Sequence, residues 1–220
     1  MHHVLSIFLL GAELSVRAGP SFAAGDAERG VPLADQTGVA PAFAIDGGWR
    51  ANQTLYVGAF WATGFGVISP SPCPEGYRCT GPTIVSELGG GARLHLPPLG
   101  RFDPWIGAGL AFAVQGSNAN RSETSPGSSG FCLFGCGPRA VHYRRDILRY
   151  GLDGMLEAGI DYRANEHIGI GLTVSTFAGK YLAVDVKEKR DGEEISSGPG
   201  SPGGDMHVWT LVAGRLVFDL

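Results

Sequence analysis

The stretch Leu148-Arg-Tyr-Gly-Leu-Asp-Gly-Met-Leu-Glu-Ala-Gly-Ile-Asp-Tyr162 decides the fold of this chain. Large apolar residues occupy alternate positions, and the positions between them hold Arg149, Asp153, Glu157 and Asp161. Successive side chains of a β-strand point to opposite faces of its sheet, so the stretch predicts a strand with one apolar and one charged face. Its 15 residues exceed the five or six or so of an ordinary globular strand and suffice to cross a bilayer.

The same alternation recurs in seven further segments. They span about residues 11–22, 39–49, 54–67, 84–96, 104–115, 168–182 and 206–220. The connections alternate in length: three are short, at 50–53, 97–103 and 163–167, and four are long and polar, at 23–38, 68–83, 116–147 and 183–205. Outer-membrane barrels show this asymmetry, with short periplasmic turns and long extracellular loops. We therefore predict an all-β, closed, up-and-down antiparallel transmembrane barrel of eight strands.

Composition and the two ends of the chain agree with one barrel domain over residues 11–220. The chain has 35 glycines, many inside apolar stretches such as 56–66, where glycine permits close approach and tight curvature. It has no run of eighteen apolar residues that would form a transmembrane helix. Residues 1–10 hold a short apolar run without a preceding Lys or Arg, which we interpret as the remnant of an export signal.

Charged residues within the predicted strands share the face opposite the large apolar residues. In a membrane barrel the apolar face meets lipid, so these charges should point into the lumen. An eight-stranded barrel has room for little more than side chains, so we expect a network of ion pairs filling the lumen, not an open pore. Its predicted members are Glu13, Arg17, Asp46, Glu87, Arg93, Arg149, Asp153, Glu157, Asp161 and Arg215, with Asp219 on the same face.

Aromatic residues also fit a membrane interface. Trp49, Trp105, Tyr162 and Phe218 lie near short turns or the C-terminal end, whereas Trp61 and Phe65 lie toward a long connection. Aromatic girdles of this kind mark the two headgroup levels of a bilayer.

Two features of the long connections suggest chemistry. Four cysteines form two close pairs, Cys73/Cys79 and Cys132/Cys136, for which we expect local disulfides in an oxidising compartment. The alternative is a metal site, although zinc sites favour closer pairs than these. The third long connection carries Arg139, Arg144 and Arg145, which could contact lipopolysaccharide phosphates or form a solvated basic loop.

Two stretches carry a family resemblance, Phe102-Asp-Pro-Trp-Ile-Gly-Ala-Gly-Leu110 and Val208-Trp-Thr-Leu-Val-Ala-Gly-Arg-Leu-Val-Phe-Asp-Leu220. With the eight strands, they resemble the small eight-stranded outer-membrane β-barrel (porin-like) superfamily. The second stretch is similar to the signal that such barrels present to the insertion machinery, although it ends in Leu220 and not in an aromatic residue. The resemblance implies the outer membrane of a Gram-negative bacterium, with membrane lipid, lipopolysaccharide and that machinery as partners. We expect a monomer.

No motif indicates a cofactor, a metal or a phosphate-binding loop, and a net charge of −4 argues against nucleic acid. We expect a non-enzymatic barrel that presents extracellular loops for envelope integrity, surface binding or adhesion. A narrow channel or carrier for small or hydrophobic solutes is one alternative. A lipid A-modifying enzyme is another, with His207 and Ser175 as its only strand-borne candidates. A soluble lipocalin-like binder is disfavoured, because it would place apolar residues inside.

Overall fold

The computed structural model describes residues 11–28, 31–32, 39–67, 82–125, 139–200 and 206–220. Within them, eight strands close into a ring by antiparallel pairing, and each expected segment corresponds to one of them, with its ends within a residue of the strand or inside it. The ring comprises β1 (Ala12–Glu28), β3 (Val39–Arg50), β4 (Leu55–Val67), β5 (Pro82–His95), β6 (Phe102–Ser125), β7 (Arg139–Arg163), β8 (Ile168–Arg190) and β10 (His207–Asp219). Because β10 pairs with both β8 and β1, no edge is left in the barrel wall. The predicted eight-stranded barrel is confirmed.

Three strands are much longer than the sequence predicts. β6 continues to Ser125, β7 begins at Arg139 and β8 continues to Arg190, so most of 116–147 and part of 183–205, expected as loops, is strand. The pairing of β6 with β7 runs without a register shift up to Ser125 and Arg139. Two short strands outside the ring extend the sheet further: β2 (Val31–Pro32) pairs with β1, and β9 (Glu193–Pro199) pairs with β8. The outward positions of these strand ends are mostly polar, so they lack the large apolar residues at alternate positions on which the expectation rested.

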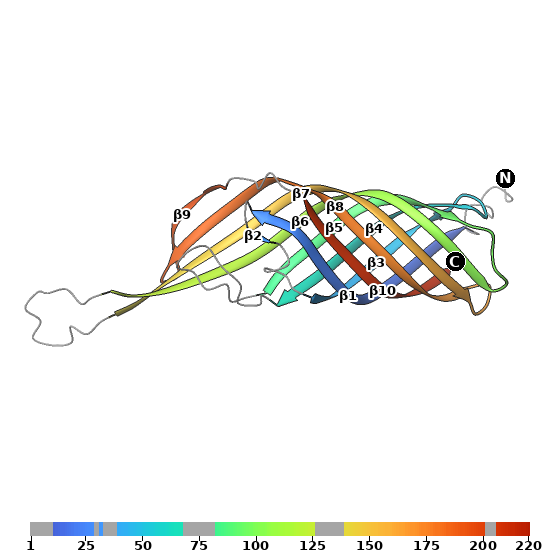
Figure 1. Ribbon diagram of the computed structural model, residues 1–220, viewed down its shortest axis with the longest axis horizontal. Helices are drawn as coiled ribbons and strands as arrows, with labels where there is room; N and C mark the ends of the chain where they lie inside the picture. Colours follow the sequence, from blue (N-terminus) through green and yellow to red (C-terminus); the bar gives the residue numbers. More distant parts are fainter. Residues whose placement is uncertain (1–10, 29–30, 33–38, 68–81, 126–138, 201–205) are drawn as a thin grey trace, which may run out of the picture.

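The short turns gather at one end of the barrel together with Leu220, and the long strands project from the other end (Figure 1). Two of the turns share a device. The side-chain Oδ1 of Asn52 accepts hydrogen bonds from the backbone N–H groups of Thr54 and Leu55, each at 2.8 Å. Asn165 does the same for His167 and Ile168, also at 2.8 Å. These side chains satisfy backbone donors that the sheet leaves unpaired where each strand begins.

A β-bulge in β8 changes which residues face the lumen. Tyr181 pairs with Gly151 and Ala183 pairs with Tyr150, so Leu182 has no partner opposite it. Between Ile168 and the bulge, the odd-numbered residues of β8 point inward. Between the bulge and Arg190, which we call the part above the bulge, the even-numbered residues point inward. The upper part of β8 therefore turns its odd-numbered side chains outward.

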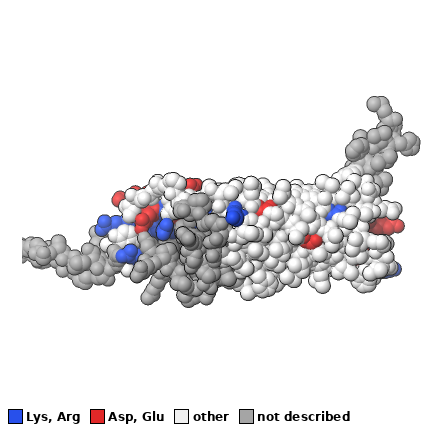
Figure 2. All heavy atoms as spheres, turned by 45° about the horizontal axis from the view of Figure 1, so that its top comes forward, with Lys and Arg blue, Asp and Glu red and all other residues white. Residues whose placement is uncertain are grey.

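Burial is inverted relative to a water-soluble protein. Leu110, Leu156 and Leu172 are 67–74% exposed on the outer wall, whereas Arg149 and Arg215 are at most 2% exposed inside. The barrel wall is mostly uncharged in the space-filling view, and charged residues gather over the extended strands (Figure 2). A belt of large apolar side chains around a closed sheet is what a bilayer requires. Among the described residues, no helix is long and apolar enough to span a membrane.

Candidate functional site: the filled lumen and the extended sheet

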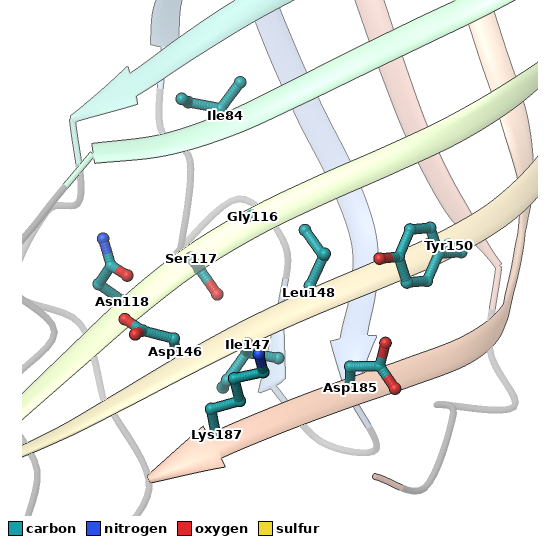
Figure 3. A pocket seen from close by; sticks show the side chains of 10 residues that line it. All are labelled: Ile84, Gly116, Ser117, Asn118, Asp146, Ile147, Leu148, Tyr150, Asp185 and Lys187. Carbon is teal, nitrogen blue, oxygen red and sulfur yellow. The ribbon is translucent and has the colours of Figure 1, made fainter. Parts of the chain in front are cut away.

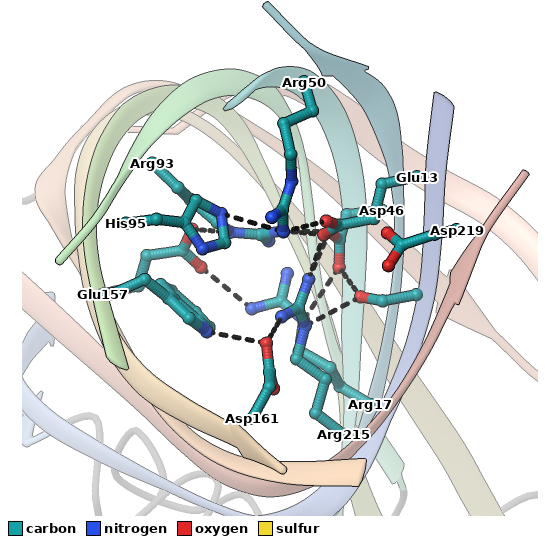
Figure 4. Close-up of polar contacts among 12 residues, drawn as sticks. Glu13, Arg17, Asp46, Arg50, Arg93, His95, Glu157, Asp161, Arg215 and Asp219 are labelled. Carbon is teal, nitrogen blue, oxygen red and sulfur yellow. Dashed lines mark hydrogen bonds and ion pairs between the residues drawn. The ribbon is translucent and has the colours of Figure 1, made fainter. Parts of the chain in front are cut away.

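A compact ion network occupies the half of the lumen nearest the short turns (Figure 4). Arg17 on β1 places Nη1 3.0 Å from Oε2 of Glu157 and Nε 3.2 Å from Oδ2 of Asp46. Arg93 on β5 contacts the same two carboxylates, with Nη1 2.5 Å from Asp46 Oδ1 and Nε 2.6 Å from Glu157 Oε1. All four side chains are almost completely buried. Two arginines thus share two acids across the barrel, so each charge has more than one counter-charge.

Arg215 and Trp105 complete this network. Arg215 Nη2 lies 2.6 Å from Oε1 of Glu13, and its Nη1 donates to Asp161. The indole N–H of Trp105 donates to Asp161 at 3.0 Å, and the guanidinium carbons of Arg93 and Arg215 lie 4.7 and 4.9 Å from the ring centroid. Expecting Trp105 in the outer aromatic girdle was therefore wrong. Its position has the inward parity of β6, where its ring supports two cations.

The network extends to four residues at the end of the lumen nearest the short turns: Arg50, His95, Asp103 and Arg163. The predicted set of lumenal residues did not include them. Arg50 Nη2 lies 2.9 Å from Glu13 Oε2, and Arg163 Nη2 lies 2.9 Å from Asp103 Oδ2. Arg163 also pairs with Asp219, and His95 Nδ1 lies 2.9 Å from Asp103 Oδ1. Arg50, Asp103 and Arg163 were assigned to the turns. They continue the inward parity of their strands by one step, and that parity was the available signal.

An apolar layer, which the sequence interpretation did not foresee, lies next along the strands. On β7, Met155 stands between Glu157 and Asp153 on the inward face. The ring of Phe177 contacts Phe60 and Trp209, with centroids 5.8 and 5.2 Å apart. All of these residues except the two acids belong to one buried cluster that also includes Leu211. The predicted charged residues are therefore divided into two groups by an apolar layer.

The second group lies beyond this layer, toward the extended strands. His207 Nε2 lies 2.9 Å from Asp153 Oδ2, and the ring of Tyr181 stacks on the imidazole with centroids 4.0 Å apart. Arg149 donates to Ser117 Oγ at 3.3 Å, and Glu87 is 1% exposed. The lumen is therefore filled in three successive layers: an ion network, apolar side chains and a smaller polar cluster.

No protein family defined by sequence matches this chain, and no curated protein does. Solved structures do match it. Neisserial surface protein A is 10% identical over 94% of this chain and 97% of its own, with a TM-score of 0.52. A major outer membrane protein from Thermus thermophilus is 13% identical over 94% of this chain and 99% of its own, with a TM-score of 0.51.

The fold is that of the small eight-stranded outer-membrane β-barrels. Together with the apolar belt, it makes the chain an outer-membrane barrel. Residues 1–10 and the cysteines Cys73, Cys79, Cys132 and Cys136 lie outside the described residues.

The structure separates the candidate residues for an enzymatic reaction in this outer-membrane barrel. Ser175 belongs to the lower network, where its Oγ accepts a hydrogen bond from Arg17 at 2.9 Å. His207 belongs to the upper cluster, and Phe177 lies between the two on the inward face of the wall. Both residues are buried in the lumen and neither reaches the membrane edge. They do not form a nucleophile–base pair. The described residues also contain no cluster that could hold a metal ion.

The basic residues assigned to the third loop lie in β7 instead. Consecutive strand residues face opposite ways, so Arg144 points outward and Arg145 inward. Arg144 Nε lies 2.7 Å from Asp146 Oδ1, and Arg145 stands opposite Glu188 on β8. Arg139 begins β7, and its side chain lies outside the described part. Arg144 and Arg145 therefore do not contribute to one phosphate site.

Proposed function

We propose that this chain is a non-conducting, non-enzymatic outer-membrane barrel that anchors an extracellular sheet for contacts at the cell surface. The observation that carries the proposal is the filling of the lumen from wall to wall. A solute crossing the barrel would have to part the pairs of Arg17 and Arg93 with Glu157 and then displace Phe177 and Trp209. Separating a buried ion pair leaves a charge uncompensated at a cost of several kcal/mol, roughly 3–5.

The extracellular sheet supports the second half of the proposal. β6, β7, β8 and β9 stay paired beyond the ends of the shorter strands, so a four-stranded sheet stands above the barrel. All seven residues of β9 are exposed. Segments held out from a rigid scaffold commonly carry binding functions. This arrangement supports surface binding or adhesion over transport.

Planar-bilayer recording tests the closed lumen. The wild-type barrel should give no stepwise conductance. A variant carrying Arg93→Ala, Phe177→Ala and Trp209→Ala, shown to be folded by heat-dependent gel migration, should conduct and so prove that the assay detects an opening. Regular current steps from the wild type would instead favour the narrow-channel alternative.

Surface labelling tests the display. The side chain of Lys187 is exposed on the extracellular part of β8. A membrane-impermeant amine reagent applied to intact cells should therefore modify it. Peptide mass spectrometry would locate the label, and cells carrying Lys187→Gln would identify the signal. Labelling of Lys187 only after cell disruption would contradict the proposed orientation and display.

A further inference from the structure

A groove of about 430 Å³ lies on the outer wall where β5, β6, β7 and β8 leave the apolar belt (Figure 3). Ile84, Leu148 and Tyr150 form its apolar part. The polar part comes from Asn118, Asp146, Asp185 and Lys187, with Gly116, Ser117 and Ile147 between. The groove is separate from the lumen, so what binds there does not depend on whether the barrel conducts.

The groove lies at the height where acyl chains give way to headgroups. Immediately below it, Leu88 and Leu152 are 62% and 60% exposed on the lipid-facing wall. Tyr150 stacks with Phe112, with ring centroids 6.2 Å apart, as expected of a pair in the outer aromatic girdle. Above Leu148, the outward positions of β7 become charged, beginning with Asp146. A molecule in the groove would therefore need an apolar end below and a polar end above.

The charges of the groove are unevenly matched within the protein. Asp146 is neutralised by Arg144 at 2.7 Å and by Lys189 at 3.5 Å. Lys187, which also faces outward above the bulge, stands opposite Asp146 on β7 but forms no ion pair with it or with another described residue, and Asp185 forms none either. The groove thus offers one uncommitted cation, one uncommitted carboxylate and the amide of Asn118 beside apolar surface.

We propose that this groove binds one phosphorylated glycolipid of the outer leaflet. Its acyl chains would lie against Ile84 and Leu148, and a phosphate would meet the ammonium of Lys187. Asp185 and Asn118 supply acceptors and donors for sugar hydroxyls, which an ordinary glycerophospholipid lacks. The mixture of one free cation with hydrogen-bonding side chains fits a sugar phosphate better than an extended polyanion.

The experiment measures retained lipid on the intact barrel. The protein is folded into phosphatidylcholine vesicles containing bisphosphorylated lipid A, extracted into mild detergent and analysed by native mass spectrometry. We expect one lipid A to stay bound to the wild type. Lys187→Gln should reduce its retention about fivefold, the effect of losing one partly exposed ionic contact. Lys180→Gln is the matched control, because Lys180 is an exposed lysine of the same strand that does not line the groove.

Lipid competition decides the chemistry. Dephosphorylated lipid A and phosphatidylglycerol should each be retained less well than lipid A. Equal retention of phosphatidylglycerol, or equal losses for Lys187→Gln and Lys180→Gln, would overturn the proposal. Each variant must show the heat-dependent gel shift of the folded barrel, and its conductance is recorded separately. A failed lipid site is thus distinguished from a failed closed-lumen function.

Discussion

Arg17 on β1 reaches across the lumen to Glu157 on β7, with 3.0 Å between Nη1 and Oε2. The two strands are not neighbours, since β8 and β10 lie between them on the ring. An ion pair between non-adjacent strands connects opposite sides of the barrel wall, whereas backbone hydrogen bonds connect only neighbouring strands. Among the described residues, no ion pair on the outer wall joins strands that are not neighbours.

Removal of one internal cation should be costly. Arg93→Met leaves Asp46 and Glu157 short of a partner and should lower the free energy of unfolding by about 3–5 kcal/mol. Arg144→Met breaks an exposed pair with Asp146 and should cost about 1 kcal/mol or less. Urea unfolding in phospholipid vesicles measures both. Comparable losses for the two variants would show that the lumenal pairs do not stabilise the barrel.

A charge placed on the outer wall should reveal the depth of the membrane. Leu156 is 69% exposed on the lipid-facing wall of β7, and Leu156→Arg should destabilise by about 2–4 kcal/mol. Val39 is 67% exposed at the extracellular end of β3, and Val39→Arg should cost about 0–1 kcal/mol. The same unfolding assay in vesicles compares them. Equal costs at both positions would be inconsistent with a belt centred on Leu156.

One inward glycine leaves room for the indole of Trp105. A Cβ at Gly159 would lie 2.4 Å from Cζ2 of this rigid ring, so Gly159→Ala should cost about 1–3 kcal/mol and shift tryptophan emission. Gly154 is the matched control on the same strand, because a Cβ there would come no closer than 3.8 Å to another atom. Unchanged stability and fluorescence in Gly159→Ala would mean that the indole is not fixed where it contacts the guanidinium groups.

Two of the three short turns each depend on a single asparagine, Asn52 or Asn165. Asn165→Ala removes the acceptor of two backbone hydrogen bonds, each 2.8 Å long, and should cost about 1–2 kcal/mol. Glu166→Ala changes the next, exposed residue and should be neutral within about 0.5 kcal/mol. Urea midpoints of the two variants, measured side by side, provide the test. A larger loss from the glutamate variant would refute the capping role.

Alternation alone was sufficient to predict the ring and the inward charges of its lower half. A membrane forces one face of each strand to be apolar, so residues such as Arg17 and Glu157 can be assigned to the other face without a structure. Extending that parity by one residue past the expected strand ends would also have found Arg50, Asp103 and Arg163.

The remaining features were not accessible in the same way. Phe60, Phe177 and Trp209 lie inside although they are large and apolar, because a packed lumen of this size tolerates apolar side chains where no charge needs a partner. Whether these side chains meet depends on how the strands are staggered around the ring. The sequence of a single strand does not determine this stagger. The length of β6 and β7 was missed because above the bilayer the outward face of a strand can be polar.

Arg215 and Glu13 are 202 positions apart in sequence, on the last and first strands of the ring, yet they bond at 2.6 Å. Such a pair forms only when the sheet closes, so a ring that lacks β10 deprives Glu13 and Asp161 of the guanidinium of Arg215. Contacts of this sequence separation carry a large loop-closure cost, and the loss of a buried counter-charge disfavours half-closed rings. Closure of the ring is therefore cooperative. The charged interior stabilises the completely inserted chain relative to a chain whose insertion has stopped before the last strand.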